Sequence, residues 1–301
     1  MPIKPSLSLS PLSSSGNPPA SLNRSLSGLT VVVTRPRAQG ETTAQCLEMA
    51  GASAIRYPVL SIEPIPMAII ERTFSPADLA HADAIIFVSA NAVEYGVPVI
   101  QQYGGLGADL VFADSTWYAI GNTTADALRS SLPAGSTQQI ETPSRGRDSE
   151  ALLAMSALQD VAGQHIIIVC GHSEAGGRTL LQQTLRERHA VVTLLICYER
   201  KNLVATTAAQ HALVVQLQSG GITTFLALSI ETLDSLMNNM HDITGWQHST
   251  LLVSHPRVAD AARQRGWLRC EVVPMNNQAL VEALYVLKPT LVLKPTLPDA
   301  S

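Results

Sequence analysis

Aromatic side chains, charged side chains and long apolar runs are all scarce in this sequence of 301 residues. Aromatic residues make up 4% and charged residues 15%, whereas 46% of the residues are hydrophobic. This composition predicts a folded chain with a mainly aliphatic core and argues against disorder. The length allows two domains of ordinary size. The longest apolar runs, such as 166–170 and 191–197, are as long as a strand. They fall short of the roughly 18 residues that span a membrane, so we expect no membrane segment.

An excess of basic residues is also absent. The net charge of −4 offers no basic face, so nucleic acid is not an expected partner. The four cysteines, Cys46, Cys170, Cys197 and Cys270, form no C-x-x-C pair. Free thiols in a reducing cytoplasm are their simplest interpretation. Residues 1–27 are rich in serine and proline and contain no apolar block. They predict a disordered tail and not a secretion signal.

The motifs of several common enzyme classes are missing. There is no phosphate-binding G-x-x-x-x-G-K-[ST], no G-x-G-x-x-G after residues 31–34, no H-E-x-x-H and no G-x-S-x-G. Nucleotide, dinucleotide, zinc and serine-hydrolase chemistry are therefore not expected. His241, His248 and His255 recur every seven residues but fall on elements of different kinds. We therefore expect no metal site shared by these histidines.

Short β-branched runs alternate with segments of helical spacing over most of the chain. This alternation predicts an α/β protein with parallel sheets and helices on both faces. We expect a loop over 133–148, and the prolines of the repeated Leu-Lys-Pro-Thr-Leu predict a tail over 288–301. The expected strands are 29–34, 52–57, 84–88, 116–120, 165–170, 191–197, 223–228, 250–253 and 269–273. The expected helices include 125–130, 149–158, 178–188, 208–217, 258–265 and 277–287.

An internal duplication organises these elements. The order of elements in 31–59 matches that in 166–198, and the order in 84–129 matches that in 223–265, including a shared Ala-Asp-Ala. We therefore predict two doubly wound parallel-sheet domains joined by a two-stranded connector, with domain two inserted into domain one. Tyr198 ends an apolar run and is expected to face the cleft between the domains. Domain one comprises 28–57 plus 203–287, domain two comprises 65–196, and the connector comprises 58–64 and 197–202.

Polar residues follow most of the predicted strands. In open parallel sheets, ligands bind beyond the carboxyl ends of the strands, where helix N-termini attract anions. Helix capping could account for any one of the serines or threonines. Together they predict a site for an anionic ligand. The candidate residues are Arg35, Ser89, Asn91, Gly121, Asn122, Thr124, Gly171, Ser229 and Ser254.

Several motifs, taken in order and spacing, resemble the uroporphyrinogen-III synthase family. The resemblance covers about residues 28–287. It implies two α/β domains joined by a two-stranded ladder and a cofactor-free enzyme of haem biosynthesis. Such an enzyme removes the hydroxyl of hydroxymethylbilane as water, inverts the terminal pyrrole ring and closes the macrocycle. The matching motifs are Val33-Thr-Arg-Pro36, Phe87-Val-Ser-Ala-Asn-Ala-Val93, Ala119-Ile-Gly-Asn-Thr-Thr-Ala125, Gly176-Gly-Arg178, Tyr198-Glu-Arg200 and Ser254-His-Pro-Arg257.

The resemblance also assigns roles. Tyr198 matches the tyrosine that assists loss of the hydroxyl, Thr124 and Ser254 match cleft-lining positions, and Arg35 and Ser89 match motif positions. The implied partner is an anionic tetrapyrrole, bound by local donors because the chain is net negative. We expect a cytoplasmic monomer.

Two alternatives to an active cyclase remain. A divergent, non-catalytic relative could bind a tetrapyrrole or a protein partner, and Cys170, where the family pattern has arginine, favours it. Tyr198 and the Gly-Asn-Thr-Thr run favour the enzyme. A periplasmic-type solute-binding protein is more distant, and the missing signal argues against it.

Overall fold

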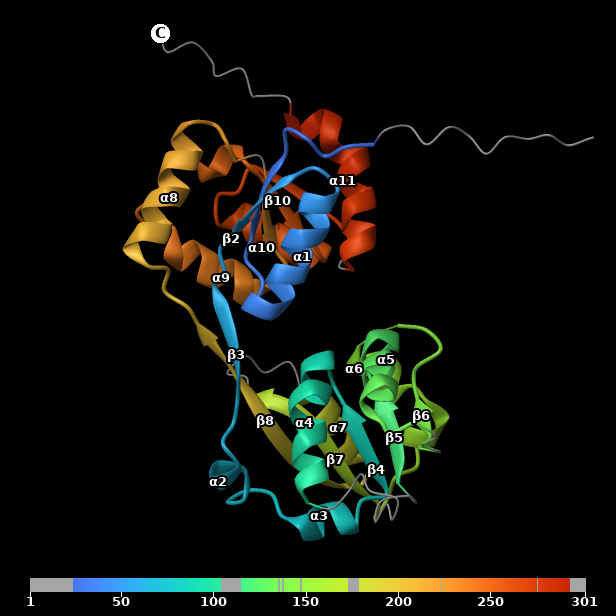
Figure 1. Cartoon of the computed structure of the whole chain (residues 1–301). Coiled ribbons are helices and arrows are strands. Elements are labelled where there is room, and N and C mark those ends of the chain that lie inside the picture. Colours follow the sequence, from blue (N-terminus) through green and yellow to red (C-terminus); the bar gives the residue numbers. More distant parts are fainter. Residues whose placement is uncertain are drawn as a thin grey trace, which may run out of the picture. The chain divides into compact units, whose positions relative to one another are not determined.

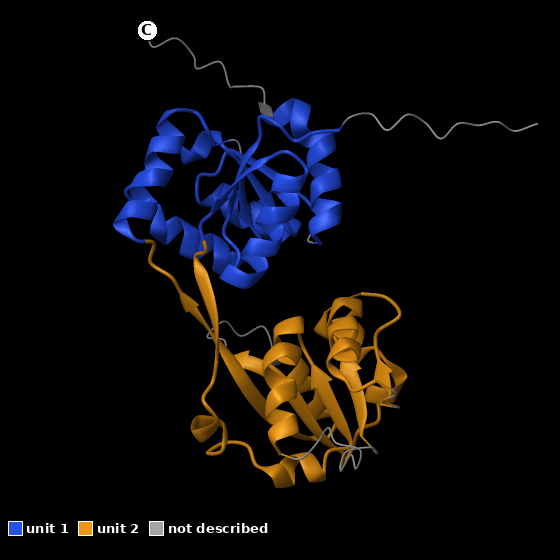
Figure 2. Ribbon diagram, in the orientation of Figure 1, with its two compact units in different colours: residues 1–57, 206–301 blue, residues 58–205 orange. Residues whose placement is uncertain are grey.

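The fold is given by a computed structural model. It describes residues 24–103, 115–134, 136, 138–146, 148–172, 179–222, 224–274 and 276–292. These residues form two compact units, each with its own sheet (Figure 2). Unit 1 comprises the described parts of 1–57 and 206–301, and unit 2 comprises those of 58–205. The motif Gly176–Arg178 and most of both expected tails lie outside the described residues.

Unit 1 contains a parallel five-stranded sheet in the order β11-β10-β9-β1-β2. Figure 1 labels its strands β2 and β10 and the helices of this unit. Helices α1 and α11 cover one face, where Leu47 and Leu284 pack against Val31 and Leu252. On the other face Phe225 meets Trp267 edge-on, with ring centroids 5.4 Å apart. The strands are β1 (Thr30–Val33), β2 (Ser53–Arg56), β9 (Thr224–Ala227), β10 (Thr250–Val253) and β11 (Arg269–Val272). The helices are α1 (Arg37–Met49), α8 (Thr207–Gln218), α9 (Ile230–Asn239), α10 (Pro256–Gln264) and α11 (Asn277–Val292).

Unit 2 is a six-stranded sheet in the order β3-β8-β7-β4-β5-β6, in which only β3 runs antiparallel. Helices α4 and α5 cover the face that carries Phe87 and Trp117, and α6 and α7 cover the face that carries Ile86 and Ile168. The strands are β3 (Leu60–Pro64), β4 (Ala84–Phe87), β5 (Thr116–Ala119), β6 (Ile140–Glu141), β7 (His165–His172) and β8 (Val191–Asn202). The helices are α2 (Met67–Ile70), α3 (Pro76–Ala80), α4 (Ala90–Gln102), α5 (Asn122–Ser131), α6 (Ser149–Leu153) and α7 (Thr179–Glu187).

The sheet orders reproduce the internal duplication. The order β8-β7-β4-β5-β6 in unit 2 corresponds to β2-β1-β9-β10-β11 in unit 1, with the same sequence segments matched. In each sheet the direction of winding reverses at one place, between β7 and β4 or between β1 and β9. Open α/β sheets bind their ligands beside such a reversal, at the carboxyl ends of the strands. Each unit therefore has one favoured place for a ligand.

The α/β fold class with mostly parallel sheets is confirmed, and the expected strands occur within a few residues of their predicted bounds. The two expected connector segments pair with each other, since β3 lies antiparallel to the end of β8 from Tyr198 to Asn202. Residues 203–205, expected in domain one, group with unit 2. The two-residue strand β6 lies within residues 133–148, which were expected to form a loop. It forms by pairing with β5, and no local sequence pattern predicts that contact.

Ordered structure extends into both segments that were expected to be tails, 1–27 and 288–301. Leu26 is fully buried against α1 and α11, and its N–H donates to the Ala50 carbonyl at 2.7 Å. At the other end α11 continues to Val292 with Pro289 inside it, because Leu291 is buried in the same core. A single buried leucine beside serines or prolines gives no periodic signal, which is why both segments were wrongly placed in tails.

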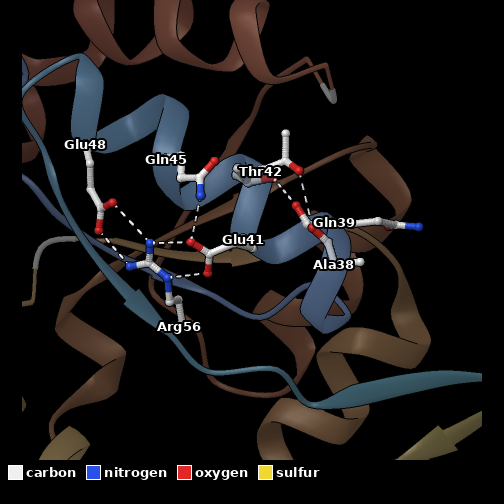
Figure 3. A network of polar contacts seen from close by, with 8 residues as sticks. Ala38, Gln39, Glu41, Thr42, Gln45, Glu48 and Arg56 are labelled. Carbon is white, nitrogen blue, oxygen red and sulfur yellow. Dashed lines mark hydrogen bonds and ion pairs between the residues drawn. The ribbon is translucent and has the colours of Figure 1, made fainter.

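A cluster of exposed ion pairs fastens β2 to α1 just before the chain leaves unit 1. Arg56 on β2 binds Glu41 at 2.7 Å and Glu48 at 2.7 Å, and Gln45 also contacts Glu41 (Figure 3). The hydrogen bonds to Arg56 hold the pKa values of both carboxyls below their usual range. The contribution of this cluster is therefore present above the usual glutamate pKa and is lost as the pH falls through the lowered values. Solvent screening keeps it small.

Candidate active site

The predicted site residues lie at the carboxyl edges of the two sheets. In unit 2, Ser89 and Asn91 follow β4, Gly121, Asn122 and Thr124 follow β5, and Gly171 and Tyr198 lie near the ends of β7 and β8. In unit 1, Arg35, Ser229 and Ser254 follow β1, β9 and β10. The structure therefore brings each group together on its own unit. Ser89, Gly171 and Tyr198 lie at the place where the winding of unit 2 reverses.

Tyr198 is buried completely, with 0% of its surface exposed. Its hydroxyl lies 3.2 Å from Ser89 Oγ. Its ring packs against that of Tyr95, with centroids 5.6 Å apart, and the Tyr95 hydroxyl donates to the Ile62 carbonyl at 3.2 Å. Helix α4 thus holds the phenol at two points, through the Tyr95 ring and through its capping residue Ser89.

A bulge in the sheet directs Tyr198 toward α4. The pairing of β7 with β8 shifts between Cys170 and Gly171, so that Cys170 faces Ile196 and Gly171 faces Tyr198. Successive side chains of a regular strand point to opposite faces. Here both Cys197 and Tyr198 belong to the α4-side core, because Cys197 is the extra residue of the bulge. Without the shift, Tyr198 would point to the α7 side.

Gly171 leaves the space that the Tyr198 ring fills. A Cβ atom on Gly171 would lie 2.3 Å from Cε2, 2.5 Å from Cζ and 2.7 Å from Cδ2 of Tyr198. Any other residue at this position would displace the ring. The structure therefore gives Gly171, expected as a substrate-binding residue, a role in positioning Tyr198.

Three of the predicted residues begin helices. Ser89 caps α4 and accepts from the Ala92 N–H at 3.0 Å, and Ser229 caps α9 and accepts from the Thr232 N–H at 3.1 Å. Gly121 precedes α5 without a side-chain cap. The run 121–124, expected as a loop before a helix from 125, thus enters α5 at Asn122, and Thr124 is buried.

Ser254 does not cap the helix that follows it. Its hydroxyl donates to the Leu228 carbonyl at 2.6 Å, and His255 caps α10 in its place by accepting from the Arg257 N–H at 3.1 Å. The Ser254 hydroxyl thereby joins the carboxyl ends of β10 and β9. The sequence alone could not distinguish helix capping from ligand binding at these serines. In the structure, capping accounts for the positions of Ser89 and Ser229, but it does not account for Ser254.

Arg35 carries a half-buried charge that no carboxylate offsets within the described part of the chain. Its Nη1 donates to Thr43 Oγ1 at 3.0 Å and to Asn277 Oδ1 at 3.2 Å, and both partners are neutral. Its buried Nε has no partner in the structure. Burial lowers the pKa of the Arg35 guanidinium, which nevertheless stays protonated at neutral pH. Burying an unpaired charge is costly, so a bound anion would stabilise this arrangement.

Sequence reasoning missed Tyr95, Thr43 and Asn277. Asn277 reaches Arg35 across 242 positions of sequence, and no local pattern announces such a contact. Among the described residues, no group of three or more His, Cys, Asp or Glu side chains could hold a metal ion. Within the same residues, none of the helices has the length and apolar character to cross a membrane.

Comparison with known proteins decides the family. Residues 41–282 match the family model described as uroporphyrinogen-III synthase HemD. The chain belongs to the uroporphyrinogen-III synthase family. It is 30% identical to the uroporphyrinogen-III synthase of Escherichia coli over 263 residues, covering 85% of this chain and 100% of the relative. It is 34% identical to that of Proteus mirabilis over 173 residues, covering 57% and 80%.

Solved structures of uroporphyrinogen-III synthases share the fold. A mutant form of the Thermus thermophilus protein superposes with a TM-score of 0.59 at 18% identity, covering 87% of this chain and 99% of that one. The Helicobacter pylori protein gives 0.53 at 13% identity, covering 86% and 99%. The resemblance inferred from the motifs and the expectation of an enzyme of this family are confirmed. The site residues remain predictions.

Proposed function

We propose that this chain converts hydroxymethylbilane into uroporphyrinogen III with Tyr198 as the source of the proton that the departing hydroxyl needs. Hydroxide leaves poorly, and protonation turns it into water as the carbon–oxygen bond breaks. Inversion of the terminal pyrrole ring and closure of the macrocycle follow. The observation that carries this proposal is the phenol of Tyr198 held beside Ser89 where the winding of unit 2 reverses.

The remaining candidates are proposed to bind the substrate's carboxylates and pyrrole groups. In unit 2 these are Asn91, Gly121, Asn122 and Thr124. The start of α5 supports this role, because its capping residue Gly121 offers no side-chain acceptor to the first N–H groups of the helix. Of these groups, the Thr124 N–H donates to the Gly121 carbonyl at 3.0 Å. In unit 1, Ser229 and Ser254 lie at the corresponding strand ends. A net charge of −4 fits recognition by such local donors.

An isomer assay tests the reaction. Hydroxymethylbilane closes without an enzyme to isomer I, so purified protein is incubated with it and the products are resolved by chromatography. We expect isomer III to dominate and to increase with enzyme concentration. Formation of isomer I alone would contradict the proposal. Binding of the bilane without isomer III would point to a non-catalytic relative.

Arg35 is proposed to bind one carboxylate of the substrate. We expect Arg35→Ala to raise KM about 10-fold, since a hydrogen bond to a charged group contributes about 1.5–3 kcal/mol, and to change kcat little. Asn277→Asp would supply a carboxylate to Arg35 from within the protein. It should also raise KM while leaving the melting temperature unchanged or higher.

Steady-state kinetics at several salt concentrations check this prediction. The wild-type KM should rise with salt, and the Arg35→Ala dependence should be flatter because one ionic contact is gone. Asn277→Ala is the matched control, because it removes the Arg35 contact without adding charge. An Arg35→Ala protein with unchanged KM and a lowered melting temperature would show a structural role only.

We extend the proposal to a cytoplasmic monomer that binds no nucleic acid. No disulfide joins any of the four cysteines, Cys46, Cys170, Cys197 and Cys270, which is the usual state in a reducing compartment. Size-exclusion chromatography with light scattering should give the mass of one chain. A dimer mass would contradict the monomer.

A further inference from the structure

The burial of Tyr198 raises a question about how its proton reaches the substrate. A general acid must come within hydrogen-bond distance of the group that it protonates. Tyr198 has no exposed surface, whereas its partner Ser89 is partly exposed. Ser89 also lies directly at the carboxyl end of β4, beside the winding reversal. The serine is therefore nearer to solvent than the phenol is.

The hydrogen bonds of Ser89 allow an arrangement in which its proton is available. A hydroxyl has one donor and two acceptor positions. Ser89 Oγ accepts from the Ala92 N–H at 3.0 Å and lies 3.2 Å from the Tyr198 hydroxyl. When Tyr198 donates in that contact, both acceptor positions of Ser89 are filled. The Ser89 O–H can then donate only to a further group, such as a ligand.

We propose that Ser89 is the residue that touches the substrate's hydroxyl and protonates it, and that Tyr198 acts through Ser89. This inference rests on the proposed function and names the path of the proton within it. The Ser89 proton passes to the leaving oxygen as its bond to carbon breaks, and water forms. The Tyr198 proton moves to Ser89 Oγ at the same time. The negative charge comes to rest on the phenolate.

The cycle balances without any further reagent. After ring closure, the pyrrole carbon that formed the new bond loses its proton as the ring regains aromaticity. That proton returns through Ser89 to the phenolate and restores both hydroxyls. A serine alone is a much weaker acid than a phenol, whose ordinary pKa is about 10. The pair lets the partly exposed serine pass on a proton that the buried tyrosine replaces.

The surroundings of Tyr198 hold the pair in line. The Tyr95 ring contacts one side of the phenol, and Gly171 leaves room for it. Ser89 is fixed by its backbone, which is extended at φ −170° and ψ 164°, and by capping α4. Neither hydroxyl needs to move far for the transfer, because the oxygens already lie 3.2 Å apart.

Rates of isomer III formation for single and double variants test the relay. Ser89→Ala and Tyr198→Phe should each lower kcat about 100-fold, the lower end of what general acids contribute, with KM within about 2-fold. The double variant should be no slower than either single one, because each breaks the same path. Ser89→Thr keeps a hydroxyl and a helix cap and should retain kcat within about 10-fold.

Two controls separate chemistry from folding. Ser89→Asn keeps an N-cap without an alcohol and should be as slow as Ser89→Ala. Asp148→Ala removes the cap of α6 in the same unit, where Asp148 Oδ1 accepts from the Ala151 N–H at 2.9 Å. It should keep full activity. When the wild-type kcat is plotted against the fraction of D₂O in the solvent, the plot should be curved and not linear, because two protons move in the same step.

The outcomes distinguish the relay from the proposed function. A wild-type protein that gives no isomer III overturns both. A slow Tyr198→Phe beside a fully active Ser89→Ala keeps the function and overturns the relay, since Tyr198 would then act directly. A fully active Tyr198→Phe shows that the phenol supplies no proton. Effects that multiply in the double variant would show two independent roles.

Discussion

Replacing Gly171 by alanine should lower kcat for isomer III about 100-fold. This decrease is as large as the one expected for Tyr198→Phe, which removes the hydroxyl itself. The added Cβ would lie 2.3 Å from the Tyr198 ring, closer than packed atoms come. A ring has no flexible end that could yield. The two backbones are paired at this point, Gly171 with Tyr198, so neither strand can retreat without breaking the ladder. The ring must therefore move, and its hydroxyl then loses the hydrogen bond with Ser89 Oγ.

Kinetics and thermal unfolding together check this prediction. KM should stay within about 2-fold of the wild-type value, because the role assigned to Gly171 is to leave room for the Tyr198 ring and not to bind the substrate. The unfolding free energy should fall by about 1–3 kcal/mol from overpacking. Combining Gly171→Ala with Tyr198→Phe should cost no further activity, since both remove the same hydroxyl from Ser89.

Cys170→Ala is the matched control for Gly171→Ala. Cys170 is the preceding residue on β7, and its side chain packs on the α7 side of the sheet, away from Tyr198. This variant should keep its activity. A fully active Gly171→Ala protein would show that the Tyr198 ring can shift without consequence, and would remove Gly171 from the site.

Replacing Gly96 by valine should destabilise unit 2 by about 1–3 kcal/mol and reduce activity as well. Gly96 lies in α4, and a Cβ there would come 2.3 Å from Val169 Cγ1 and 3.4 Å from Cys197 Sγ. The glycine thus lets α4 lie against β7 and β8. Since α4 carries the Ser89 cap and Tyr95, pushing it outward should lengthen the distance from Ser89 Oγ to the Tyr198 hydroxyl.

Thermal unfolding and kcat are the measurements for Gly96→Val. Gln101→Val, on the exposed side of the same helix, controls for a β-branched residue in α4 and should have little effect. Adding Val169→Ala removes the methyl that the new side chain meets and should restore part of the stability. No rescue by Val169→Ala would mean that the loss does not arise at this contact.

The sequence predicted the parts of the site that depend on strand ends. Ser89, Gly121 and Ser229 were found because each follows a short apolar strand, and parallel strands bring such positions to one edge of a sheet. The duplication gave the matched strands, and the sheet orders agree with that match. These features are local patterns repeated at regular intervals, which a single sequence displays.

Contacts between distant segments could not be predicted in this way. Asn277 holds Arg35, Tyr95 packs on Tyr198, and Leu26 is buried beneath α1 and α11. Each partner stands alone in its own segment without a periodic neighbour. Only the packing of the helices on the sheet selects them.

Tyr198 shows the division most clearly. By itself the sequence determined that a tyrosine ends the apolar run of β8, and the family motifs made it the best candidate for the proton source. The duplication also led to the expectation that Tyr198 faces a cleft between two domains. The tertiary structure places that phenol inside unit 2, beside Ser89. The physical reason is the bulge at Cys170 and Gly171, which turns Tyr198 to the α4 side, together with a glycine that leaves it room. Both depend on how β7 pairs with β8, and that register is set by the whole sheet.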